Sequence, residues 1–108
     1  MAVHIYMPLA QAVTVTTSVS TCEERANERF AGGIIEVPTG SSITTLTFHH
    51  ATVSGGTYYP LYDSDGNAVT MTVAAGRSYI QPAALNQASH LKAVGNAAGT
   101  INWQGKTL

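Results

Sequence analysis

The chain has 108 residues, which is enough for one domain with a single modest core and too few for two. Only 10% of the residues are charged, against a usual share of about 25%, and the formal net charge is −1. This composition offers no broad basic surface to attract phosphate backbones, so we expect no direct nucleic-acid partner. The single cysteine, Cys22, excludes an intrachain disulfide framework and a multi-cysteine metal site, and we interpret it as a small residue in a loop.

The chain begins with an apolar stretch, MAVHIYMPL. It has neither the basic region nor the long apolar region of a secretory signal, and no apolar run in the chain approaches the length of a membrane span. We therefore expect a soluble protein made in a cytoplasm, without a membrane partner. Pro8 disfavours helix at the residue before it, so we predict an extended arm over residues 1–11 and a domain over residues 12–108. The arm would dock on this chain's own sheet or on a neighbour's, with Ile5, Tyr6 and Met7 as candidate interface residues.

Residues 11–20 show the clearest strand pattern in the chain. Val13, Val15 and Val19 fall on one face of this predicted strand, and Thr and Ser residues fall on the other.

A charged segment, TCEERANERF, follows over residues 21–30. Thr21 and Glu24 have the spacing of a capping box, which predicts a short helical turn. The segment is either a solvated charged loop or a polar contact point on a partner subunit, where arginine is favoured. The second interpretation makes its charged side chains candidate interface residues: Glu23, Glu24, Arg25, Glu28 and Arg29.

Residues 43–78 read as three consecutive strands joined by two glycine-bearing turns. Strict alternation of apolar and polar residues over residues 45–49 and 69–73 predicts strands with one buried face. Between them, residues 58–62 are aromatic, and Pro60 restricts this strand to a sheet edge or a bulge. The alternation predicts a core that includes Leu46, Phe48, Val69, Met71, Ile101 and Trp103, with Thr45, Thr47, Thr70 and Thr72 outside it.

The turn DSDGN, residues 63–67, carries an Asp-Gly pair that is a strong hairpin signal. Its alternating Asp, Asp and Asn residues also resemble the opening of a calcium loop. However, Ala68 and Ala74 stand where that motif needs glycine and a bidentate glutamate. We interpret the segment as a hairpin turn without a metal.

The rest of the chain adds strands at 34–37 and 78–80, a helix of about two turns at 82–88, and a final hairpin of 90–94 with 100–103. In this hairpin Leu91, Ala93, Ile101 and Trp103 should point into the core. About eight short strands with one or two short helical turns indicate an all-β antiparallel sandwich, jelly-roll-like in character.

No constellation of residues favours catalysis, and we predict neither enzyme activity nor a cofactor. His49 and His50 are adjacent and face opposite sides of a strand, and no serine or cysteine lies in a nucleophile motif. The aromatic residues have two interpretations: a platform for sugar, or the usual aromatic content of strands and cores. They are Tyr58, Tyr59, Tyr62, Tyr79 and Trp103.

Four phrases between Gly33 and Gly99 carry a family resemblance: IIEVPTGSSITTLTF, SGGTYYPLYDSDGNAVTMTVAAGRSY, a Pro-Ala-Ala-Leu segment and LKAVGNAAGT. This segment resembles small β-sandwich structural proteins of tailed bacteriophages, of the head-decoration or capsid-cement type. The resemblance implies a virion protein on the capsid surface, made in the host cytoplasm, that binds the major capsid protein, forms a homo-oligomer such as a trimer, and stabilises the head. It carries over no functional residue. The alternatives are a phage tail or fibre accessory protein and a carbohydrate-binding module that recognises glycans through its tyrosines.

Overall fold

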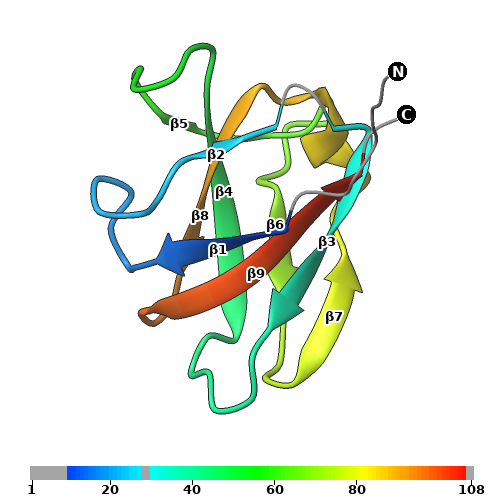
Figure 1. The fold of residues 1–108 in the computed structure, drawn as a ribbon. Helices are drawn as coiled ribbons and strands as arrows, with labels where there is room; N and C mark the ends of the chain where they lie inside the picture. The colour runs from blue at the N-terminus through cyan, green and yellow to red at the C-terminus, as the bar shows by residue number, and fades with distance from the viewer. Residues whose placement is uncertain (1–9, 28–29, 107–108) are drawn as a thin grey trace, which may run out of the picture.

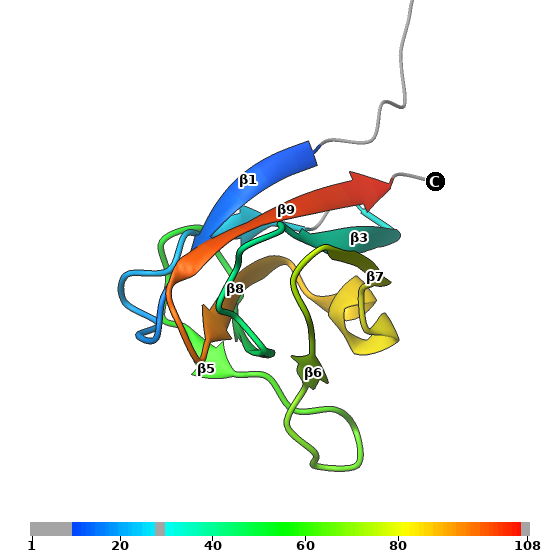
Figure 2. The ribbon, with the colours of Figure 1, turned by 90° about the horizontal axis from the view of Figure 1, so that it is seen from below.

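Two antiparallel sheets lie face to face in the computed structural model, which describes residues 10–27 and 30–106. Sheet A has the order β1 (Ala10–Val15), β9 (Gly99–Lys106), β3 (Gly32–Val37) and β7 (Arg77–Ile80). Sheet B has the order β2 (Arg25–Ala26), β8 (His90–Gly95), β4 (Thr45–Ala51) and β5 (Tyr59–Pro60), and β6 (Thr70–Thr72) also pairs with β4. The two layers are seen edge-on in Figure 2. The predicted all-β antiparallel sandwich is confirmed, with nine strands in place of about eight.

The core lies between the sheets and contains the inward-facing residues that the alternation predicts. Leu46, Phe48, Ile101 and Trp103 are fully buried, Val69 is buried, and Met71 packs against them from a partly buried position. Trp103 meets Phe48 edge-on, with ring centroids 5.8 Å apart, and its indole N–H donates to Gln81 Oε1 at 2.9 Å. Since Thr45, Thr70 and Thr72 are exposed and Thr47 is half-buried, the predicted register of these strands is confirmed.

The predicted final hairpin is wrong, because its two strands belong to different sheets. β8 pairs with β4 and β2, whereas β9 pairs with β1 and β3. The intervening turn crosses between the layers and is held by Asn96, whose Oδ1 accepts the N–H groups of Thr44 and Thr45. The expected burial of Leu91, Ala93, Ile101 and Trp103 is nevertheless confirmed. Both arrangements place these residues inward, so the alternation could not distinguish them.

The three strands predicted within residues 43–78 share β4 as their centre. β5 pairs with β4 at His49 and His50, and β6 pairs with the other end of β4, at residues 45–47. Pro60 lies at the sheet edge, as predicted. Strand β1 is shorter than expected: Val13 and Val15 point inward, but the chain turns from Thr16 onward and Val19 is only half-buried.

Two short segments differ from the prediction to different degrees. The expected helix at 82–88 is a single 3₁₀ helix, η1 (Ala83–Gln87), which buries Leu85. The expected helical turn in the charged segment is absent from its described part: residues 21–27 contain a turn and then the two-residue strand β2.

The predicted boundary between arm and domain differs from the structure, because β1 already includes Ala10 and Gln11, which were assigned to the arm. The rest of the arm, residues 1–9, lies outside the described residues.

The turn at residues 63–67 is a hairpin turn, as predicted. Asp63 Oδ1 accepts the N–H groups of Asp65 and Asn67, both at 2.9 Å, and Gly66 has a φ of 83°. Within residues 10–27 and 30–106, no group of three or more His, Cys, Asp or Glu side chains is arranged to hold a metal ion.

Replacing Phe48 by alanine tests the position of the core. We expect Phe48→Ala to lower the free energy of unfolding by about 3–5 kcal/mol, because a fully buried ring leaves a cavity. The exposed Thr70 on β6 offers the control: Thr70→Ala should change it by less than about 1 kcal/mol. Urea denaturation measures both values, and equal losses would place Phe48 outside the core.

Replacing Gly66 tests the hairpin turn. Gly66→Val should lower the free energy of unfolding by about 1–3 kcal/mol, because a β-branched residue is strained at positive φ. Gly32→Ala is the control, since its φ is not positive and its added Cβ would meet no atom within 4 Å. We also expect calcium to leave the melting temperature of the unmodified protein unchanged, and a clear rise would contradict the hairpin interpretation in favour of a metal loop.

Candidate interaction surface

The outer face of sheet A is an open, charge-poor surface that crosses four strands. Alternation along β1, β9, β3 and β7 directs every second side chain outward, and most of these residues are exposed. Most outward residues are small or uncharged, and only Glu36 and Lys106 among them are charged: Ala10, Ala12, Thr14, Gly32, Ile34, Glu36, Ser78, Ile80, Thr100, Asn102, Gln104 and Lys106. A broad face of this kind loses little solvation when another protein covers it.

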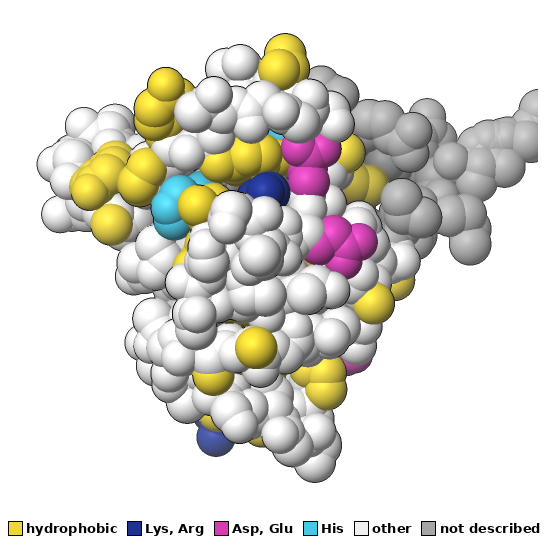
Figure 3. Space-filling view, turned by 90° about the vertical axis from the view of Figure 1, so that its left-hand side faces the viewer, with side chains coloured by type: hydrophobic (Ala, Val, Ile, Leu, Met, Phe, Trp, Pro, Cys, Tyr) yellow, Lys and Arg dark blue, Asp and Glu magenta, His cyan; other side chains and the backbone are white. Residues whose placement is uncertain are grey.

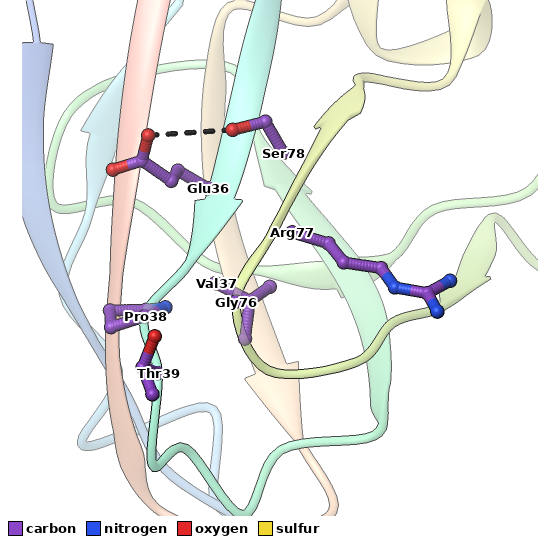
Figure 4. Close-up of a pocket in the computed structure, with 7 residues that line it drawn as sticks. All are labelled: Glu36, Val37, Pro38, Thr39, Gly76, Arg77 and Ser78. Carbon is purple, nitrogen blue, oxygen red and sulfur yellow. Dashed lines mark hydrogen bonds between the residues drawn. The ribbon is translucent and has the colours of Figure 1, made fainter.

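Glu36 is the charge nearest the middle of this face. Its carboxylate accepts from Asn102 Nδ2 at 3.3 Å and from Ser78 Oγ at 3.4 Å. Beside it lies an open hollow of about 290 Å³, lined by residues 36–39 and 76–78. Figure 4 shows that Arg77 extends away from Glu36, so this pair does not form an ion pair across the hollow.

Glu24, a predicted interface residue, is bound within the chain instead. Its carboxylate accepts from Tyr58 Oη at 2.6 Å, from Ser54 Oγ at 2.6 Å and from the Gly55 N–H at 2.8 Å. The Gly55 N–H, followed by the two hydroxyl donors, lowers the pKa of Glu24 to about 2. Glu24 therefore anchors the loop between β4 and β5 against the start of β2.

Lys92 completes this arrangement on the outer face of sheet B. Its ammonium group lies 4.8 Å from the centroid of the Tyr58 ring and donates to the Val19 carbonyl at 3.0 Å. Burial, and then the Glu24 carboxylate, raise the pKa of Tyr58, and burial lowers the pKa of neighbouring His49. Figure 3 shows histidine, cationic and acidic side chains gathered on this side of the molecule. No local sequence pattern predicts this cluster, because its members are distant in the chain.

Arg25, the next predicted interface residue, is completely buried. Its guanidinium lies 4.8 Å from the centroid of Phe30 and 5.0 Å from that of Trp103. Burial lowers the pKa of Arg25 to about 10, so the side chain remains charged at neutral pH. In the single chain Arg25 is a core residue and does not present its charge to a partner.

The remaining predicted interface residues divide into two groups. Glu23 is exposed at the edge of sheet A, where its carboxylate accepts the Thr14 N–H at 2.9 Å. Ile5, Tyr6, Met7, Glu28 and Arg29 lie outside the described residues. Among the described residues of the charged segment, Glu23 therefore presents an exposed carboxylate.

The five aromatic residues proposed as a sugar platform do not share one surface. Trp103 is fully buried, Tyr79 packs against the core, and the Tyr58 hydroxyl is bound to Glu24. Tyr59 and Tyr62 are 68% and 58% exposed, but they are three residues apart on an extended segment, which directs them to opposite faces.

Comparison with known proteins gives no relative: no family model, no curated protein and no solved structure matches this chain. The described residues contain no helix long and apolar enough to cross a membrane.

Replacing Glu24 tests its internal role through pH dependence. Because folding lowers its pKa from 4.5 to about 2, the carboxylate stabilises the fold fully above pH 4.5, and this contribution is lost as pH falls through 2. We expect Glu24→Gln to be less stable than the unmodified protein at pH 7, with a difference that shrinks between pH 4.5 and 2.

Thermal unfolding followed by circular dichroism across this range measures the difference. Glu23→Gln provides the control. A Glu24→Gln protein whose deficit does not change with pH would show that the carboxylate charge is not what Ser54, Gly55 and Tyr58 recognise.

Proposed function

We propose that this chain is a structural protein of a bacteriophage virion, a decoration or cement protein that binds the major capsid protein on the capsid surface. The resemblance of residues 33–99 to such proteins suggests this role, and the outer face of sheet A is the observation that supports it best. On that face, mostly uncharged residues extend across all four strands from β1 to β7.

The proposed mechanism is mechanical. A protein that buries surface across neighbouring capsid subunits stabilises the assembled lattice by its binding free energy, so separating those subunits costs more. Thr, Ser and Ala side chains suit such a contact, because they lose little rotamer freedom on burial and their removal from water leaves no unpaired charge. Strands hold the face in shape before binding, which lowers the ordering cost of association.

Glycan recognition is the second candidate function, as for a tail or fibre accessory protein or a carbohydrate-binding module. The exposed ring of Tyr59 favours it. A shallow hollow beside Tyr59 is also lined by His50, Thr52 and Thr57, which offer polar groups. A glycan array with Tyr59→Ala as control distinguishes this function from capsid attachment.

A charge placed on the outer face of sheet A tests the capsid role. Thr100 is exposed on β9, a central strand of sheet A, so Thr100→Glu should fold normally. We expect it to bind capsids that lack this protein at least about tenfold more weakly than the unmodified protein does, because a carboxylate would be desolvated at the contact. Thr72→Glu, on exposed β6 of sheet B, is the matched control and should bind as the unmodified protein does. Co-sedimentation with particles measures both, and normal binding by Thr100→Glu would remove this face from the proposal.

Deleting residues 1–9 tests the predicted arm. Because β1 begins at Ala10, we expect the shortened protein to keep its fold, as judged by circular dichroism, and to lose part of its hold on the capsid or of its oligomer. Unchanged affinity and oligomeric state would show that the arm is not an attachment device. Loss of folding would make it a part of this chain's own core.

A further inference from the structure

The outer edge of β7 is open in the described structure. The Gln81 N–H donates to the Gly33 carbonyl, so Gly33 and Gln81 form a hydrogen-bonded pair between β3 and β7. Hydrogen-bonded pairs alternate along antiparallel strands, so the odd-numbered residues of β7 bond to β3. Ser78 and Ile80 therefore direct their backbone N–H and C=O groups away from β3. No other described strand pairs with β7. Ile80 is also 81% exposed, the largest exposed fraction among the large apolar side chains of the described residues. An open edge with an exposed isoleucine is a template for strand addition.

The opposite edge of sheet A, at β1, is half closed. β1 uses its odd-numbered residues for pairing with β9, so Ala10, Ala12 and Thr14 direct their backbone groups outward. At Thr14 these groups are already taken: its N–H donates to Glu23 Oε1 at 2.9 Å and its C=O accepts the Glu23 N–H at 3.0 Å. Among the described residues, the part of this edge that remains unpaired is therefore short, Ala10 to Ala12.

We propose that the β1 edge of one copy of this chain pairs with the β7 edge of a second copy. Each pairing in sheet A is antiparallel and the order is β1-β9-β3-β7, so β1 and β7 run in opposite directions. Copies placed side by side in the same orientation would thus continue the antiparallel alternation across the junction. In the matching register Ala12 lies opposite the second copy's Ser78, and Ala10 opposite its Ile80.

Charge favours this pairing over the pairing of two identical edges. In the register above, the end of β1 that carries exposed Glu23 meets the end of β7 that carries exposed Arg77. Arg77 is exposed and its side chain extends away from Glu36, as Figure 4 shows, so its guanidinium is available to a carboxylate. Pairing β1 with β1 would involve no Arg77 guanidinium, and pairing β7 with β7 would involve no Glu23 carboxylate, so neither arrangement forms this contact.

The pairing is heterologous, because two different edges meet, so successive copies form a closed ring or an open filament. It would extend the outer face of sheet A across several copies. The inference deepens the proposed function, and in that sense rests on it: a ring would present one continuous charge-poor surface to the capsid lattice.

Disulfide trapping between single-cysteine-substituted proteins tests the pairing. Hydrogen-bonded residues in antiparallel strands have Cα atoms about 5.5 Å apart, within the range of a disulfide. We expect a mixture of Ala12→Cys and Ser78→Cys to form a covalent dimer under mild oxidation, well above the yield of either variant alone. Thr100→Cys mixed with Ser78→Cys is the matched control, and the unmodified protein reports on the buried Cys22. A yield no higher than in these controls would overturn the proposal, as would dimers from Ser78→Cys mixed with Ile80→Cys, which indicate paired β7 edges.

A lysine at the β7 edge supplies a second readout. Adding Ile80→Lys to the Ser78→Cys protein should lower the mixed-dimer yield at least about tenfold, because a buried or crowded ammonium opposes edge pairing. Thr72→Lys, on exposed β6, should leave the yield unchanged. An unchanged yield with Ile80→Lys would contradict pairing at this edge. The trapping experiments contain no capsids, so they test the interface separately from the virion role. A covalent dimer from a protein that does not bind capsids would support the interface and contradict the virion role. Capsid binding without a covalent dimer would support the virion role and contradict the interface.

Discussion

The stacking of the buried Arg25 guanidinium on Trp103 and Phe30 is the interaction around which this sandwich is organised. It enters the core from β2 in sheet B and lies against Trp103 of β9 in sheet A, with Phe30 as a second aromatic contact. Aromatic faces replace part of the hydration that a buried cation loses. The stack also requires glycine at residue 105, since a Cβ there would lie 2.4 Å from Phe30 Cγ and 2.6 Å from Arg25 Nη2. A larger residue would force the Phe30 ring and the Arg25 guanidinium to shift from these positions.

Three consecutive residues of the charged segment consequently serve three different places. With Arg25 directed inward, Glu24 lies on the outer side of sheet B, where it binds Tyr58 and the loop before β5. Glu23 lies at the β1 edge of sheet A and occupies the backbone groups of Thr14. The segment therefore connects the core, the polar cluster on the outer face of sheet B and the β1 edge of sheet A.

Local patterns predicted most of the strands and little of the site. Period-two alternation identified the buried side of β4 and β6 correctly, because burial of one face is a local property of a strand. It could not decide that β8 and β9 pair in different sheets, since both pairings bury Leu91 and Trp103. Arg25 was expected at the surface, because runs of charge usually are solvated, and its aromatic partner in β9 lies far along the chain. The open edge of β7 follows only from strand order, which no local pattern supplies.

A cryo-electron microscopy map of a virion carrying this protein would show whether the outer face of sheet A is the contact surface. We expect density for this chain on the capsid exterior, with residues such as Thr100 and Asn102 covered by the major capsid protein or by a neighbouring copy. A map in which that face is open to solvent in every copy would contradict this assignment.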